Sequence, residues 1–132
     1  MTTHLASILI VDDERAIVNV LERSLAAHGY TVHTACGGFE ALAALEHLEP
    51  DVLLLDINLP DLTGWEVLRR LSPADRERVP VIVFSASPLS PSRVDEFHPA
   101  GVLLKPFPMD ALIRVVDEVT GAHREELEKS DA

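Results

Sequence analysis

The stretch Val52-Leu53-Leu54-Leu55-Asp56 decides how the fold is interpreted, and the turn formers Pro60 and Gly64 follow it closely. Its four apolar residues run without a polar break and then end on a single carboxylate. A short apolar run of this kind is typical of a strand that is buried on both faces, as in a parallel sheet. An ionised carboxylate at the end of such a strand is costly to desolvate unless a cation or hydrogen-bond donors meet it. Asp56 therefore needs partners from other parts of the chain.

Strands and helices are predicted to alternate along the chain. Short runs of apolar and β-forming residues predict further strands at Ser7–Val11, Tyr30–Ala35, Pro80–Ser85 and Gly101–Lys105. Apolar residues at helical spacing predict helices over residues 15–28, 39–48, 65–71, 92–97 and 109–119. The apolar stripe of the first helix consists of Ile17, Val20, Leu21 and Leu25. Alternation at this spacing predicts βαβ units, and hence a doubly wound parallel sheet with helices on both faces.

The length and composition favour one domain with its own core. The chain has 132 residues, of which 47% are hydrophobic. We assign residues 1–121 to a single domain and residues 122–132 to a charged tail that we expect to fray. The only cysteine is Cys36, which excludes an internal disulfide and favours a reducing compartment. No apolar stretch approaches the ~20 residues of a membrane span and no signal peptide is evident, so we expect a soluble cytoplasmic protein without membrane contact.

The charge of the chain argues against one class of partner. There are 22 acidic and 11 basic residues, which give a formal net charge of −11. An acidic field repels phosphate backbones, so we expect no direct binding to nucleic acid. The six histidines show no pairing at metal-ligand spacing, and no histidine metal site is predicted.

Polar residues stand at the ends of four predicted strands, namely Asp12-Asp13, Asp56, Ser85 and Lys105. In an open doubly wound sheet, ligands bind outside the carboxyl ends of the strands, where the strand order reverses. Each residue alone has an ordinary explanation as a turn residue, a cap or a solvated charge. Their coincidence at four strand ends predicts instead that three carboxylates, one hydroxyl and one ammonium share a crevice.

The charges of this crevice indicate its chemistry. Three carboxylates close together repel one another, and a hard divalent cation removes that conflict. Mg²⁺ suits one or two carboxylates together with water and phosphate oxygens. Lys105 adds positive charge, and phosphoryl transfer needs above all positioning and charge neutralisation. Because a carboxylate can be the nucleophile of such a transfer, we predict an aspartyl-phosphate at Asp56, with Asp12 and Asp13 holding the metal.

Four segments resemble the motifs of response-regulator receiver domains: Val11–Glu14, Leu55–Gly64, Pro80–Ala86 and Lys105–Phe107. The resemblance extends from Ser7 to Thr120, which is nearly the whole chain. It implies an α/β, flavodoxin-like (βα)5 fold of three layers with strand order 2-1-3-4-5. It also implies a Mg²⁺-dependent domain that takes a phosphoryl group from a phosphohistidine on a sensor histidine kinase or a histidine phosphotransfer protein.

The resemblance assigns metal ligands within the crevice. It implies that Asp13 and Asp56 bind Mg²⁺ directly, with Asp12 acting largely through water. It also implies that Asn58 contributes its backbone carbonyl to the same ion.

The resemblance further assigns the groups that handle the phosphoryl group. It implies that Asp56 is the phosphoacceptor, that Ser85 donates its hydroxyl to a phosphoryl oxygen, and that Lys105 pairs with the phosphoryl group or with the acceptor carboxylate. Ala86 is small enough to let the phosphoryl group approach. The peptide bond between Lys105 and Pro106 is often cis in the family, because the local geometry is tight.

Two features depart from the family pattern and concern the output surface. Receiver domains usually carry Tyr or Phe three residues before the lysine, where this chain has Val102, which has no ring to turn inward. The segment between the serine and the lysine is also short, and three prolines limit its helix: Pro88, Pro91 and Pro99. We therefore expect the site chemistry to be retained and the usual output geometry to be altered.

Two other interpretations stay open. One is a pseudo-receiver, a binding module of the same fold that is never phosphorylated. The other is an aspartyl-phosphate hydrolase of the haloacid-dehalogenase type, which needs an acid where this chain has Asn58 and a late acidic cluster where Asp12-Asp13 lies early. Only one helix is predicted after Lys105, so we expect the signal to leave by docking to a downstream protein whose identity is open.

Overall fold

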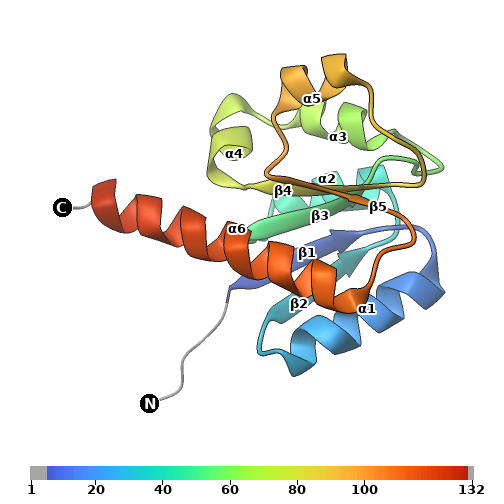
Figure 1. The fold of residues 1–132 in the computed structure, drawn as a ribbon. Helices are drawn as coiled ribbons and strands as arrows, with labels where there is room; N and C mark the ends of the chain where they lie inside the picture. The colour runs from blue at the N-terminus through green and yellow to red at the C-terminus, as the bar shows by residue number, and fades with distance from the viewer. Residues whose placement is uncertain (1–5, 131–132) are drawn as a thin grey trace.

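The computed structural model of the chain describes residues 6–130, and the side chains of residues 6–121. Five strands form one parallel sheet in the order β2-β1-β3-β4-β5 (Figure 1). The strands are β1 (Ser7–Val11), β2 (Thr31–Ala35), β3 (Val52–Asp56), β4 (Val81–Ser85) and β5 (Gly101–Leu104). Each matches a predicted strand to within one residue, and the flavodoxin-like, doubly wound topology is confirmed.

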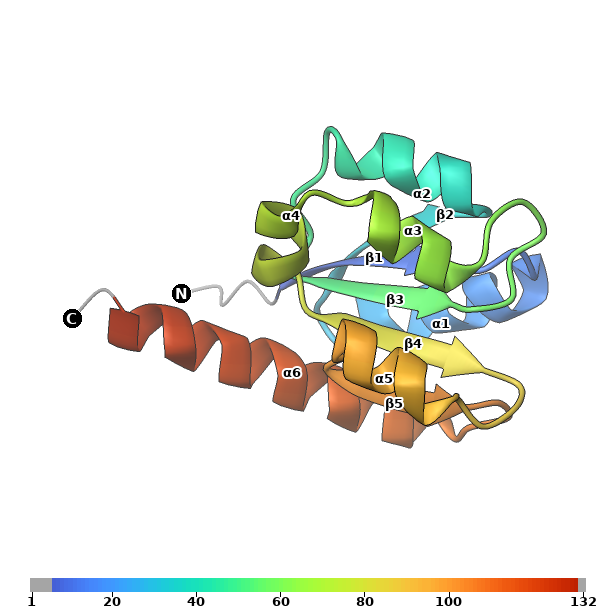
Figure 2. The same cartoon turned by 90° about the horizontal axis from the view of Figure 1, so that it is seen from above.

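Helices cover both faces of the sheet and complete the three layers (Figures 1 and 2). On one face, α1 (Arg15–Ala27) and α6 (Met109–Ser130) place Leu21 and Leu112 in one apolar cluster. On the other face, α2 (Gly38–Leu45) and α3 (Gly64–Arg70) place Ala41 and Trp65 in a second cluster. Two short helices complete the second layer, α4 (Pro73–Arg78) and α5 (Pro91–Phe97).

Strand β3 occupies the middle of the sheet, between β1 and β4. All five of its residues are buried. Leu53 and Leu55 belong to the cluster under α2 and α3, whereas Val52 and Leu54 belong to the cluster under α1 and α6. Successive side chains of a strand point to opposite faces, so a strand covered on both sides has no place for a polar residue. Asp56 is thereby delivered to the carboxyl edge of the sheet.

Helix α4 is not predicted by the sequence pattern. The third helix ends at Arg70, one residue before its predicted end, and a further short helix begins at Pro73. The Ser72 hydroxyl accepts a hydrogen bond from the Asp75 N–H at 3.1 Å, and proline occupies the first turn, which are both helix-start features. None of its residues is buried, so no apolar stripe marks the helix.

Helix α6 is longer than predicted. The expected helix covers residues 109–119 and the expected fraying begins at residue 122, but the backbone is helical as far as Ser130 (Figure 1). Residues 122–130 are rich in strong helix formers, and the expected fraying of this segment stays a prediction. Residues 131–132 lie outside the described part, and the division between domain and tail at residue 121 stays a prediction. Among the described residues, no helix is both long and apolar enough to cross a membrane.

Candidate functional site

Three carboxylates meet at the carboxyl edge of the sheet. Strand β1 leads into Asp12 and Asp13, and strand β3 ends on Asp56. One carboxylate oxygen of each residue lies within 4.8 Å of the others, and we call this group the carboxylate cluster. Asp12 and Asp56 are buried, whereas Asp13 is exposed to solvent. Hard oxygen ligands, of which one remains open to water, fit the requirements of Mg²⁺.

Lys105 supplies the positive charge that this cluster needs. Its ammonium lies 2.9 Å from Asp12 Oδ2 and 3.0 Å from Asp56 Oδ2. Glu14 lies at the rim of the crevice, with Oε1 3.9 Å from the same nitrogen. The peptide bond between Lys105 and Pro106 is cis, which confirms the prediction. Two buried carboxylates without a cation would be strongly destabilising, so the lysine stabilises the site in the absence of a metal.

Burial and hydrogen bonding together set the pKa values of Asp56 and Lys105. Burial raises the pKa of the Asp56 carboxyl, although hydrogen bonds from the Asn58 N–H and from Lys105 oppose the rise. Burial acts to lower the pKa of the Lys105 ammonium, but its hydrogen bonds to Asp12 and Asp56 outweigh burial and leave that pKa raised. The lysine therefore stays charged beside the carboxylates.

The loop between β3 and α3, residues 57–63, brings Asn58 beside Asp56. The Asn58 N–H donates to Asp56 Oδ1 at 2.9 Å, and the Gly64 N–H donates to the Ile57 carbonyl at 2.8 Å. Gly64 is needed for this close approach, because a Cβ atom there would lie 2.8 Å from the Asp56 carbonyl oxygen. Thr63 begins α3 and accepts a hydrogen bond from the Glu66 N–H at 3.1 Å.

Ser85 lies at the end of β4, as predicted, and is buried. Its hydroxyl donates to the Ser87 carbonyl and accepts from the Ser87 N–H at 3.2 Å. The hydroxyl is thus engaged by the loop that follows β4. Ser87 was not predicted as a partner of Ser85, although a serine that bonds the backbone two residues further on is a recognised turn signal.

An apolar groove opens beside Lys105 and was not predicted. It has a volume of about 600 Å³ and lies between α1 and the β5–α6 loop. We call it the α1 groove, and its lining includes Ile17, Val20, Lys105, Phe107 and Met109. Val20 belongs to the apolar stripe of the first helix, but it is 55% exposed and lines this groove. The helical spacing identifies the apolar face of α1, but it does not show which residues of that face are covered by the rest of the protein.

Val102, which stands where receiver domains usually carry an aromatic residue, lies on the exposed side of β5. Val102 is 43% exposed and Leu104 is 48% exposed. Leu103, between them, packs against the cluster that contains Phe84 and Leu112. Alternation therefore places the two exposed residues on the α5 side of the strand, where a helix of seven residues leaves them uncovered.

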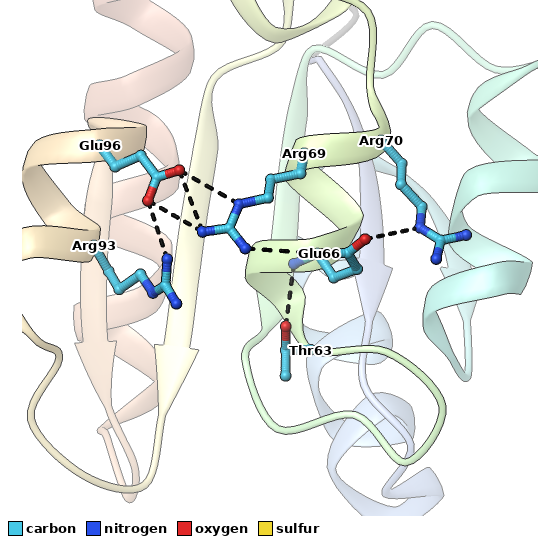
Figure 3. Close-up of polar contacts among 6 residues, drawn as sticks. All are labelled: Thr63, Glu66, Arg69, Arg70, Arg93 and Glu96. Carbon is cyan, nitrogen blue, oxygen red and sulfur yellow. Dashed lines mark hydrogen bonds and ion pairs between the residues drawn. The ribbon is translucent and has the colours of Figure 1, made fainter.

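Contacts between α3 and α5 hold the second layer together (Figure 3). The Arg69 guanidinium donates to both oxygens of Glu96, at 3.2 and 3.3 Å from Nη2, and Arg93 Nη1 donates to Glu96 Oε1 at 3.1 Å. The rings of Trp65 and Phe97 stack with their centroids 5.2 Å apart. Trp65 therefore covers the junction of α3 with α5, in addition to packing against the sheet.

The fold and the crevice define a flavodoxin-like domain with a carboxylate and lysine site at the carboxyl edge of its sheet. Residues 8–117 match the family described as the response regulator receiver domain. The chain belongs to this family, as its motifs predict.

Similar proteins agree with this assignment. The chain is 38% identical over 113 residues to response regulator MprA of Mycobacterium ulcerans, and the match covers 80% of this chain and 46% of MprA. The chain thus spans about half the length of the curated relatives it matches. Chemotaxis response regulator CheY4 of Vibrio cholerae has 29% identity and a TM-score of 0.80 over 87% of this chain and 98% of its own. TrrA of Thermotoga maritima, solved in complex with Mg²⁺–BeF, has 29% identity and a TM-score of 0.77 over 87% of this chain and 99% of its own.

Proposed function

We propose that this receiver domain is a phosphoacceptor switch in which Asp56 takes a phosphoryl group from a phosphohistidine. The donor is a sensor histidine kinase or a histidine phosphotransfer protein. The observation that carries the proposal is the position of the Lys105 ammonium, 3.0 Å from Asp56 within a cluster of three carboxylates. The complex of TrrA with Mg²⁺–BeF supports Mg²⁺ as the cofactor.

The proposed reaction is a displacement at phosphorus. An oxygen of the Asp56 carboxylate attacks the phosphoryl group, an O–P bond forms, and the P–N bond to the donor imidazole breaks. The imidazole keeps the electron pair of that bond and takes up a proton from solvent. Lys105 pairs with the transferred group, and Ser85 exchanges its bond to the Ser87 carbonyl for one to a phosphoryl oxygen.

The residues that would hold Mg²⁺ are the carboxylate cluster and the backbone carbonyl of Asn58. When bound, the ion neutralises negative charge on the phosphoryl oxygens. The chain itself fixes the acceptor, because Asp56 is held by the Asn58 N–H at 2.9 Å and by Lys105 at 3.0 Å. We propose that the domain catalyses only its own phosphorylation and dephosphorylation, as a signalling domain and not as an enzyme with turnover.

The α1 groove is the proposed docking surface for the donor. It is apolar, it borders Lys105, and it lies beside α1, so an apolar helix face of the donor fits there next to the acceptor. A net charge of −11 disfavours nucleic acid as a direct partner, and the downstream partner is a protein. The exposed thiol of Cys36 agrees with a reducing compartment, and we place the domain in the cytoplasm.

Phosphorylation by a small donor tests the proposal. The protein is incubated with Mg²⁺ and acetyl phosphate, and intact mass is followed before and after hydroxylamine treatment. We expect one hydroxylamine-labile phosphoryl adduct that is absent from Asp56→Ala. Asp51→Ala is the matched control, because Asp51 lies at the opposite end of β3 and accepts a hydrogen bond from the Ser7 N–H at 2.8 Å.

Each other interpretation has its own outcome in this experiment. If neither acetyl phosphate nor a phosphohistidine donor yields an adduct, the domain is a pseudo-receiver. If acetyl phosphate is consumed in many turnovers without accumulation of an adduct, the domain is a hydrolase of the haloacid-dehalogenase type.

A further inference from the structure

Asp61 joins the site loop to a helix that takes no part in the site. Its Oδ1 atom accepts hydrogen bonds from the Gly38 N–H and the Leu62 N–H, both at 2.8 Å. Its Oδ2 atom accepts from the Phe39 N–H at 3.0 Å. These backbone bonds, of which that from Phe39 is the strongest influence, hold the pKa of the Asp61 carboxyl below its usual range. The side chain thus binds as a carboxylate to two segments more than twenty residues apart in the chain.

Asp61 replaces the cap that α2 lacks. The residue before α2 is Gly37, which has no side chain to cap the helix. The first N–H groups of a helix need a partner, and Asp61 supplies it from another segment. The two glycines make this approach feasible. A Cβ atom on Gly37 would lie 3.1 Å from Asp61 Oδ2, and one on Gly38 would lie 2.8 Å from the Cβ atom of Leu62.

The other end of the same loop belongs to the site. Asn58 is bonded to Asp56 through its N–H, and the Gly64 N–H closes the loop on the Ile57 carbonyl. Asn58 also pairs with Thr63 in an isolated antiparallel bridge. The loop is therefore anchored to β3 at its base and to α2 at its outer turn. The anchor at the outer turn is Asp61.

We propose that Asp61 is a positioning residue that, by capping α2, holds the β3–α3 loop so that the Asn58 backbone is presented to the metal. This inference rests on the proposed function, because it concerns the same Mg²⁺ site. Outer partners that orient metal ligands commonly change metal affinity by about 10- to 100-fold when they are lost. Asp61 acts through the backbone of a loop, so we expect an effect near the lower limit.

The test measures Mg²⁺ binding by calorimetry and loop opening by amide hydrogen exchange. Asp61→Ala should weaken Mg²⁺ binding by roughly tenfold and should increase exchange in residues 57–64. Asp61→Asn keeps an acceptor for two of the three N–H groups, and its affinity should lie between those of the unaltered protein and of Asp61→Ala. Asp61→Glu keeps the charge, but its side chain is one methylene longer and does not fit the close approach to Gly37 and Gly38. It should therefore also weaken Mg²⁺ binding.

A matched control separates this role from general destabilisation. Asp51→Ala also removes a carboxylate that accepts a backbone N–H from a distant segment, but it does so at the far end of β3. It should leave Mg²⁺ affinity unchanged. The inference is overturned if Asp61→Ala binds Mg²⁺ as tightly as the unaltered protein. It is also overturned if Asp61→Glu binds normally while Asp61→Asn is as weak as Asp61→Ala, because charge alone would then explain the effect.

Failure of the proposed function has a different signature. If the unaltered protein binds Mg²⁺ but forms no phosphoryl adduct, phosphoacceptor function is wrong while the role of Asp61 toward the metal is still measured. If the unaltered protein binds no Mg²⁺, the role of Asp61 toward the metal is wrong as well.

Discussion

The ammonium of Lys105 lies 3.0 Å from the carboxylate of Asp56, although the two residues are 49 positions apart in the chain. The same nitrogen lies 2.9 Å from Asp12, so one cation is shared by two buried carboxylates. Where Mg²⁺ binds to this cluster, the ion and the lysine compensate the same charge. We therefore predict that Mg²⁺ changes the stability of the domain, and that the size of this effect depends on Lys105.

Lys105→Met should therefore destabilise the metal-free protein. We expect the free energy of unfolding to fall by about 2 kcal/mol, which is less than the ~3–5 kcal/mol of a fully buried pair. The reason for the smaller value is that 16% of the Lys105 side chain remains exposed. Mg²⁺ should stabilise Lys105→Met more than the unaltered protein, as measured by urea denaturation with and without the ion. Arg78→Met, which removes a surface cation, is the control, and an equal Mg²⁺ effect in all three proteins would contradict the prediction.

If the donor protein docks in the α1 groove, a substitution there should slow transfer from a phosphohistidine protein but not phosphorylation by acetyl phosphate. Val20→Glu places a charge in the groove at a residue that is 55% exposed, so folding should be little affected. Transfer from a phosphohistidine protein should slow by at least about tenfold, because a desolvated charge in an apolar contact costs more than 1.4 kcal/mol. Phosphorylation by acetyl phosphate should be unchanged. Val102→Glu is the matched control, since Val102 is also an exposed valine but lies on β5 away from the groove.

We predict that the contact of Glu96 on α5 with Arg69 on α3 contributes to stability in a pH-dependent way (Figure 3). The Arg69 guanidinium, helped by Arg93, holds the pKa of the Glu96 carboxyl below its ordinary value of 4.5. A lowered pKa contributes stability above the ordinary value, and that contribution is lost as the pH falls through the lower pKa of the folded state. The difference in unfolding free energy between the unaltered protein and Glu96→Gln should therefore be constant near pH 7 and shrink below about pH 4.5.

Chemical denaturation at a series of pH values measures this difference. Asp95→Asn, which removes a neighbouring carboxylate from the same helix, corrects for the change of net charge. Fluorescence of Trp65 reports the contact itself, because its ring stacks on Phe97 of α5. A difference that grows toward low pH would contradict the assignment.

We predict that the residue at position 102 affects how phosphorylation changes partner binding. Val102→Tyr restores the ring that receiver domains usually carry, at a position that is 43% exposed and has room for it. We expect the affinity for a downstream partner to change more than the yield of phosphorylated Asp56, because Val102 lies on the exposed side of β5 and is not part of the carboxylate cluster. Partner binding and adduct yield are measured on the same preparations. Equal changes in both would show that residue 102 acts on the chemistry and not on output.

The five strands, five of the six described helices and the polar residues at the strand ends could be predicted from the sequence pattern. Strand β3 was recognisable because a strand covered on both faces must be apolar throughout, as Val52 to Leu55 are. Asp12, Asp13, Asp56, Ser85 and Lys105 could be identified because the carboxyl ends of parallel strands must meet. These features follow from local periodicity and from the direction of the chain.

Which side chains meet across distant segments became known from the three-dimensional structure alone. No local pattern indicates that Asp61 caps α2, that Ser85 is held by Ser87 in this state, or that Val20 lies beyond the edge of its covering layer. Helix α4 buries no residue and so left no apolar pattern. The physical reason is that periodicity records the average burial of an element, whereas these contacts depend on strand order, register and the lengths of neighbouring helices.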